Sequence, residues 1–284
     1  MKKIIVPTDF SENAYAALLY TCKLYAYEEV QFTILHSFEA EMSQLTSRVD
    51  VGRSDAVLQK LTKSTTKEGE RLLEKLKADK IPTNHHYRFI TTPYTLSREI
   101  NSMIENEGAS LVAMGSKGRT GLEEVLMGST TEYITQTIQG CPLLIVPNDV
   151  NFVIPRFIAF ATDYNDFMPI SRIKALTRLV RHFGSEIILV HVGDEADLSK
   201  KQLENYENYR NDLSEYDSQF VFVKKDKSVS NTLHKLIDEK NIDLISLIFH
   251  KHAFIKKLFR EPVVTRVGQH RNVPTLVIPA PVTS

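Results

Sequence analysis

The chain of 284 residues has few cysteines, no excess charge of either sign and no long apolar run. Its two cysteines, Cys22 and Cys141, are too few for a disulfide framework and too far apart for a short metal or redox motif. We therefore expect buried thiols in a reducing compartment. The 35 basic and 35 acidic residues cancel, which excludes a global field that attracts nucleic acid or an anionic membrane.

The sequence also shows neither the pattern of a membrane-spanning segment nor that of a signal peptide. No stretch approaches the roughly 18 apolar residues of a membrane span. The apolar run within residues 1–7 is too short for a signal peptide and is typical of a strand. These absences predict a cytoplasmic protein with neither nucleic acid nor membrane as a partner.

The sequence contains an internal repeat in which four segments recur in the same order. Residues 3–9 recur as 157–163, residues 32–37 as 187–192, residues 109–114 as 242–247, and residues 141–147 as 273–279. Four ordered matches are hard to obtain by chance, and self-similarity of this kind indicates a repeated unit. We predict two domains, residues 1–149 and 150–284, with the joint near residues 147–155.

Each copy alternates short, β-branched apolar runs with longer stretches of helical periodicity, which is typical of a parallel sheet with helices on both faces. The predicted strands are 3–8, 30–36, 85–90, 110–114 and 143–146, then 157–162, 186–192, 218–223, 242–248 and 275–278. The predicted helices are 12–26, 55–79, 94–107 and 129–139, then 168–183, 198–214, 229–240 and 261–269. The fold class is α/β, with a five-stranded, mainly parallel sheet in each domain.

Local signals refine the boundaries of these elements. Ser11 and Thr95 are expected to be helix N-caps, and Ser129-Thr130-Thr131-Glu132 has the pattern of a capping box. The polar segment 40–54 is expected to be a mobile loop.

Four of the 11 glycines lie in one window that follows the strand 110–114 and precedes the helix at Ser129. They are Gly115, Gly118, Gly121 and Gly128. A doubly wound sheet binds its ligands just beyond the carboxyl ends of its strands, where this window lies. Glycines expose backbone N–H groups, and a helix N-terminus adds further donors and a favourable dipole. With Lys117 and Arg119 beside it, the window predicts a phosphate site.

The common phosphate motifs do not match this window. Thr120 stands where the Walker pattern requires its second glycine, and no Gly-x-Gly-x-x-Gly occurs. The spacing that does occur is Gly115-x2-Gly118-x9-Gly128-Ser129. It resembles the G-x2-G-x9-G-[S/T] signature of the universal stress protein family (UspA-like). The segment 4–11, Ile-Ile-Val-Pro-Thr-Asp-Phe-Ser, and the strand end Leu35-His36-Ser37 also resemble that family, once per half of the chain.

The resemblance implies two tandem Rossmann-like domains of the adenine nucleotide α-hydrolase type, with ATP or AMP bound in the first. Residues that match the family's contacts to adenine, ribose and the α-phosphate are Pro7, Thr8, Asp9, Ser37, Met114 and Gly115. Residues that match its phosphate cradle are Gly118, Gly128, Ser129 and Thr130, with Lys117 and Arg119 adding positive charge. Mg²⁺ that bridges the phosphates is a further expectation, because this ion commonly binds through phosphate oxygens and waters.

The second copy lacks the glycines of the first. Ile248 stands at the position of Gly115, Lys251 at that of Gly118, and Arg260 or Glu261 at that of Gly128. Side chains therefore replace bare backbone, and we expect one nucleotide per chain. The resemblance also implies that strands 143–146 and 276–278 pair within one chain, as family dimers pair through their last strands. Further homodimerisation is left open.

Three functions remain open at this point. The first is a nucleotide-dependent regulator of the stress response. The second is a slow ATPase or a self-phosphorylating protein that uses Ser129 or Thr130, although no general base is identifiable beside the predicted cradle. The third is an interaction module without a ligand. His36 and His191 recur at equal positions, where a hydrogen-bonded histidine of the core is expected more than a metal ligand.

Overall fold

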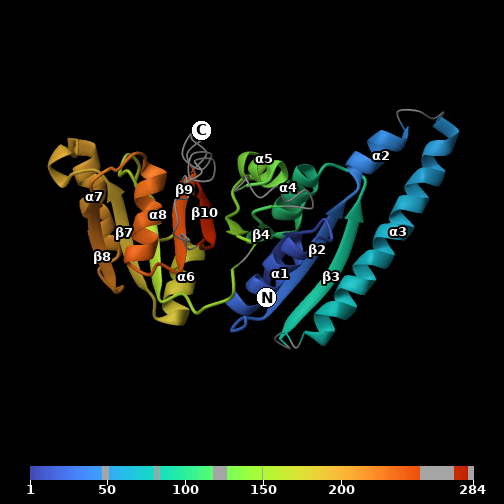
Figure 1. Ribbon diagram of the computed structural model, residues 1–284, viewed down its shortest axis with the longest axis horizontal. Coiled ribbons are helices and arrows are strands. Elements are labelled where there is room, and N and C mark those ends of the chain that lie inside the picture. Colours follow the sequence, from blue (N-terminus) through green and yellow to red (C-terminus); the bar gives the residue numbers. More distant parts are fainter. Residues whose placement is uncertain are drawn as a thin grey trace. The chain divides into compact units, whose positions relative to one another are not determined.

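The computed structural model describes residues 1–46, 51–79, 81, 84–117, 127–148, 150–249 and 272–280. Within these residues the chain forms two compact units, and the boundary falls between Leu143 and Leu144. Strands and helices alternate along the chain in both units (Figure 1). The division of the sequence at residues 149 and 150 into two family domains stays a prediction.

The first unit contains a parallel sheet with five helices. Its strands are β1 (Lys2–Pro7), β2 (Val30–Ser37), β3 (His85–Thr92) and β4 (Leu111–Gly115), and β5 (Leu143–Val146) spans the boundary. Its helices are α1 (Glu12–Leu24), α2 (Glu39–Thr46), α3 (Val51–Ala78), α4 (Leu96–Glu107) and α5 (Ser129–Thr137). The strand order is β3-β2-β1-β4, and each of the three neighbouring pairs is parallel.

The second unit repeats this order. Its strands are β6 (Phe157–Ala161), β7 (Glu186–Val192), β8 (Ser218–Val223), β9 (Leu244–Phe249) and β10 (Thr275–Pro279). Its helices are α6 (Lys174–Phe183), α7 (Lys200–Asp212) and α8 (Val229–Glu239), with a 3₁₀ turn at Glu195–Asp197. The order β8-β7-β6-β9-β10 is parallel throughout. The predicted pairing of strands 143–146 and 276–278 concerns how the two units are placed, and it stays a prediction.

The central strands form the core because their side chains are apolar on both faces. In β1, Ile4, Ile5 and Val6 are all buried, as are Phe32 and Ile34 in β2. Continuous apolar strands of this kind are expected where helices cover a parallel sheet. Among the helices of this unit, α1 packs on β4 and α3 packs on β3. The predicted α/β class is confirmed. Each predicted strand begins and ends within two residues of the observed strand.

The segment 40–54, predicted as a mobile loop, is largely helical, so that prediction was wrong. Helix α2 covers residues 39–46, α3 begins at Val51, and α2 packs against α3. The helix α2 begins with Glu39 and Glu41, whose carboxylates complement the dipole of its first turn. Packing and helix-forming residues outweigh the polar composition on which the loop prediction rested.

The first helix of the second unit begins at Lys174, six residues after the predicted start. The N–H groups of Met168 and Ile170 donate instead to side chains of α7, Tyr209 Oη at 3.0 Å and Asp212 Oδ2 at 3.0 Å. Pro169 lies between them and disfavours a helical conformation in the residue before it. The predicted helix 261–269 lies outside the described residues. In the described part of the chain, no helix has the length and apolar character needed to cross a membrane.

Both cysteines are free and buried, as predicted. Burial raises the pKa of the Cys22 thiol to about 12, and it raises the pKa of the Cys141 thiol to about 12 as well. At pH 8 both are therefore thiols, whereas the reactive species is the thiolate. We expect neither cysteine to react with a thiol-specific reagent such as DTNB at pH 8 in the native protein, and both to react after unfolding in urea. Fast labelling of either one without denaturant would contradict the burial.

Candidate functional site

The candidate site lies at the carboxyl edge of the first sheet, where β1 and β4 are neighbours. Ile4 pairs with Leu111 and Ile5 with Val112 in parallel register. From β1 the chain continues to β2 on one side, while β4 returns on the other. Such a reversal of strand order opens a crevice beyond the strand ends, where doubly wound sheets bind ligands. Figure 1 shows β2 and β4 in this unit.

A tight turn closes the carboxyl end of β1. The Phe10 N–H donates to Thr8 Oγ1 at 3.0 Å, and Asp9 Oδ1 accepts from the Ser11 N–H at 3.1 Å and from the Ser11 hydroxyl at 2.6 Å. Ser11 Oγ then accepts from the Ala14 N–H at 3.2 Å, which confirms Ser11 as the N-cap of α1. The bonds hold the Asp9 carboxylate at the carboxyl edge of the sheet.

An aromatic contact supports this turn from β2. Phe10 has a positive φ of 61°, which is uncommon for a bulky residue, and its ring lies 4.6 Å from that of His36. His36 Nδ1 lies 2.8 Å from the Thr8 carbonyl oxygen, so this nitrogen carries the proton and donates it. His36 is thus a buried, hydrogen-bonded residue that positions the turn, as predicted.

At the end of β4, Gly115 packs closely against α1. A Cβ atom at this position would lie 3.1 Å from the Asn13 carbonyl oxygen and 3.2 Å from the Lys117 carbonyl oxygen. Such contacts are tighter than a side chain normally tolerates. The glycine therefore allows β4 and α1 to approach each other. This packing role is separate from the exposure of backbone N–H groups that the sequence pattern suggested. Met114, before it, is buried.

The residues that follow β4 are hydrogen-bonded to the residues that begin α5. The Gly128 N–H donates to the Ser116 carbonyl oxygen at 2.7 Å, and the Thr131 hydroxyl donates to the Gly115 carbonyl oxygen at 2.9 Å. Both bonds fix the start of α5 against the end of β4. Among the predicted cradle residues, Gly118 and Arg119 lie outside the described residues, and Lys117 is half-buried.

The predicted capping box at Ser129 was wrong. The N-cap of α5 is Gly128, because its carbonyl oxygen accepts from the Glu132 N–H, and a glycine has no side chain that could cap the helix. Ser129 is consequently the first residue inside the helix and cannot act as its N-cap. The side chains of Ser129 and Thr130 are exposed. Because the N-cap is a glycine, no N-cap side chain accepts from the first-turn N–H groups of α5 at the carboxyl edge of the sheet.

Ser37 borders the site at the end of β2. Its hydroxyl donates to the carbonyl oxygen of Tyr94, in the loop between β3 and α4, at 2.6 Å. The structure therefore places six of the predicted residues at or just beyond the ends of three neighbouring strands, β2, β1 and β4. They are Pro7, Thr8, Asp9, Ser37, Met114 and Gly115. Sequence analysis missed Asn13, Thr131 and Tyr94 as residues that shape this edge. Of these three, only Thr131 could have been found from the sequence, because it belongs to a run of hydroxyl residues at the start of a predicted helix. Sequence analysis assigned that run to helix capping.

The same turn recurs after β6 in the second unit. The Tyr164 N–H donates to Thr162 Oγ1 at 3.1 Å, and the Asn165 N–H donates to Asp163 Oδ1 at 3.0 Å. Tyr164 also has a positive φ of 56° and stacks on His191 with ring centroids 5.2 Å apart. Each contact has its equivalent in the first unit, so the sequence repeat is also a repeat of local structure.

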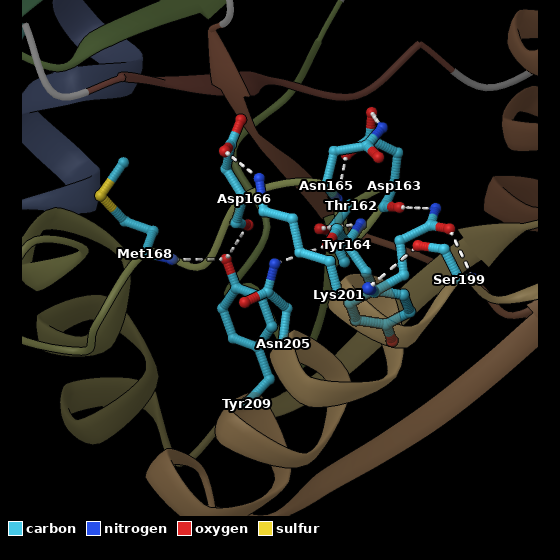
Figure 2. A network of polar contacts seen from close by, with 11 residues as sticks. Thr162, Asp163, Tyr164, Asn165, Asp166, Met168, Ser199, Lys201, Asn205 and Tyr209 are labelled. Atoms are coloured by element: carbon cyan, nitrogen blue, oxygen red, sulfur yellow. Dashed lines mark hydrogen bonds and ion pairs between the residues drawn. The ribbon is translucent and has the colours of Figure 1, made fainter. Parts of the chain in front are cut away.

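In the second unit, however, side chains of α7 cover this turn (Figure 2). The Gln202 amide donates to the Asp163 carbonyl oxygen at 2.8 Å, and the Asn205 amide donates to the Tyr164 carbonyl oxygen at 2.8 Å. Lys201 forms an ion pair with Asp166 at 3.4 Å in the same place. A capping box of Ser199 and Gln202 fixes the start of α7. Two backbone acceptors of the turn after β6 are thus engaged by side chains of the same unit.

Among the residues that the structure describes, no group of three or more histidine, cysteine, aspartate or glutamate side chains is placed to hold a metal ion. The histidines 250 and 252 lie outside those residues. His85 and His86, on β3, have separate partners, the Tyr25 carbonyl oxygen and the Glu29 carboxylate.

Comparison with known proteins identifies the family. The model of the universal stress protein family matches residues 1–147. The chain belongs to the universal stress protein family. The universal stress protein MJ0577 of Methanocaldococcus jannaschii is 28% identical over 153 residues, which cover 51% of this chain and 94% of the relative. The universal stress protein YxiE of Bacillus subtilis is 29% identical over 147 residues, which cover 51% and 97%.

A solved universal stress protein from Archaeoglobus fulgidus is similar over both halves. It is 17% identical, covers 98% of each chain and has a TM-score of 0.64. This likeness shows the fold of the whole chain. The family match itself covers the first half, which carries the glycine signature.

The bond from Thr131 to Gly115 makes a testable contribution to stability. Thr131→Val keeps the shape of the side chain but leaves the buried Gly115 carbonyl without this donor. We expect the free energy of unfolding to fall by about 1–3 kcal/mol, measured by urea denaturation without nucleotide. The exposed neighbour provides the control, since Thr130→Val should change stability by no more than about 0.5 kcal/mol. Equal effects of the two substitutions would show that the bond has no special role.

Proposed function

We propose that the first unit of this universal stress protein binds ATP or AMP at the carboxyl edge of β1 and β4, and that the chain is a nucleotide-dependent regulator of the stress response. One observation carries the proposal. Helix α5 begins at a glycine without a side-chain cap, at the sheet edge where the glycine signature of the family is found. First-turn N–H groups that no N-cap side chain engages, together with the positive end of a helix dipole, suit an anionic phosphate group.

The phosphate end of the nucleotide is assigned to α5. Gly128 allows close approach, and the exposed hydroxyls of Ser129 and Thr130 are additional donors. Lys117 supplies positive charge, and Gly118 and Arg119 are assigned the same roles from the sequence pattern. Mg²⁺ in this proposal is held by phosphate oxygens and waters, and it supplies charge neutralisation.

The nucleoside end is assigned to the turn after β1 and to Ser37. Pro7 and Thr8 form the buried wall beside the turn, and the Asp9 carboxylate has the acceptor capacity for ribose hydroxyls. Met114 and Gly115 face the ribose and the α-phosphate. The hydrogen bonds from Ser11 hold the carboxylate before the ligand arrives, which lowers the entropy cost of binding.

The second unit is assigned a role without nucleotide. The amides of Gln202 and Asn205 already use the backbone acceptors of the turn after β6, and Ile248 stands in β9 where the first unit has Gly115. We infer a degenerate tandem copy that acts as an interaction module. Pairing of the last strands of the two units, and dimerisation of the chain, belong to this proposal as well.

The nucleotide content of the purified protein tests the proposal. Protein prepared without added nucleotide is denatured, and the released nucleotides are separated by chromatography and quantified. We expect about one adenine nucleotide per chain. In Gly128→Glu, whose backbone φ of −68° accepts any residue, the carboxylate would repel the phosphates, and we expect affinity for ATP to fall by about a hundredfold or more. AMP or ADP recovered after incubation with ATP would indicate hydrolysis.

Two matched aspartates provide the control, because Asp9 and Asp163 hold equivalent turns. Asp9→Ala should remove nucleotide, whereas Asp163→Ala should leave the content at one per chain. Both variants lose a bond from the backbone N–H two residues on and one from the side chain of that residue, so a merely structural effect would act on either unit. Wild-type protein that contains no nucleotide and fails to bind added ATP would overturn the proposal, and two nucleotides per chain would overturn the assignment of the second unit.

A further inference from the structure

The loop between β3 and α4 is tied firmly to the end of β2. Ser37 and Thr92 are register partners in the parallel pair, and the Phe38 N–H donates to the Thr92 carbonyl oxygen at 3.0 Å. The Ser37 hydroxyl then reaches the Tyr94 carbonyl oxygen at 2.6 Å. The backbone of Tyr94 is therefore fixed directly beside Ser37.

The loop is also held from within. The Tyr94 N–H donates to Thr92 Oγ1 at 3.2 Å, and the Thr92 hydroxyl donates to the Glu99 carboxylate of α4 at 3.2 Å. Thr92 is buried, so these bonds are shielded from water. The backbone of Tyr94 is thus held by a network that involves three elements, β2, β3 and α4.

The ring of Tyr94 is nevertheless exposed. It keeps 48% of its surface accessible, which makes Tyr94 one of the few large apolar residues exposed in the described part of this unit. The Arg98 guanidinium carbon lies 4.1 Å from the ring centre, so a cation covers one face and restrains the orientation of the ring. An aromatic ring held in this way has the properties of a stacking platform for a nucleic acid base.

The second unit provides an internal comparison. Thr95 and Ser228 are the N-caps of the equivalent helices α4 and α8. The residue before the cap is Tyr94 in the first unit and Lys227 in the second, where the loop 224–228 reads Lys-Lys-Asp-Lys-Ser. The aromatic residue is therefore present in the unit that has the glycine signature and absent from the unit that has lost it.

We propose that Tyr94, oriented by Arg98, forms the base side of the nucleotide site and selects purine nucleotides by stacking. This inference rests on the proposed nucleotide site, because Ser37 is the residue assigned to the base. A purine offers a larger ring surface than a pyrimidine, so the platform favours ATP over CTP. Tyr94 is a specificity-determining residue here, and Arg98 is a positioning residue.

The test compares nucleotides with a ligand that lacks the base. Calorimetry on the full chain, stripped of nucleotide, measures affinities for ATP, CTP and ribose 5′-triphosphate. In Tyr94→Leu we expect ATP to bind about tenfold more weakly, CTP to be less affected, and ribose 5′-triphosphate to bind as it does to the wild type. Tyr94→Phe keeps the ring and should keep the affinity for ATP. Arg98→Met should weaken ATP binding by about threefold.

The outcomes separate this inference from the proposed function. If the wild type binds ATP and Tyr94→Leu changes that affinity by less than twofold, the role of Tyr94 is wrong and the nucleotide site stands. An equal loss for ATP and for ribose 5′-triphosphate would indicate a distortion of the site and would also contradict base stacking. If the wild type binds neither ATP nor ribose 5′-triphosphate, the proposed function itself fails. An unchanged thermal midpoint in Tyr94→Leu confirms that the variant is folded.

Discussion

The parallel pairing of β1 with β4 is the constraint on which the candidate site depends. Because these strands are neighbours, the turn that carries Asp9 and the glycine at position 115 end at the same edge of the sheet. Gly115 lets α1 approach β4, and the Thr131 hydroxyl uses the Gly115 carbonyl to hold α5 at that edge. The open N-terminus of α5 is thus placed by contacts that begin in the core.

The two units show how one local structure leads to two outcomes. Phe10 with His36 and Tyr164 with His191 build the same strained turn, with positive φ values of 61° and 56°. In the second unit, α7 supplies amide groups that donate to the backbone of the turn (Figure 2). The turn is therefore a property of the repeated sequence near β1 and β6. Whether a ligand can reach it depends on a helix that is distant in sequence.

Sequence analysis succeeded where the deciding interactions join residues close in sequence, and it failed where they join residues far apart. The apolar runs predicted the strands because burial on both faces leaves a local signal, and Ser11 was recognised as an N-cap because capping acts over three residues. The capping box at Ser129 failed because α5 begins one residue earlier, with Gly128 as its N-cap. The start of the helix is held by the bond from Thr131 to Gly115, which is 16 residues away and leaves no local signal. The segment 40–54 was misjudged because α2 packs on α3, and composition alone carries no information about that contact. Tyr94 escaped notice because it was counted as the first residue of the predicted helix 94–107, whereas α4 begins at Leu96.

By itself, the sequence determined the alternation of strands and helices, the internal repeat and the glycine spacing that relates the first half to universal stress proteins. These features depend on periodicity and on short-range spacing, which can be read along the chain. The tertiary structure decided where the helix α5 begins, which hydroxyls remain exposed, and that side chains of α7 bond the equivalent turn in the second unit. It also decided that Tyr94 lies beside Ser37. Such contacts join residues that are far apart in sequence, and they form only when parallel strands bring their carboxyl ends to one edge.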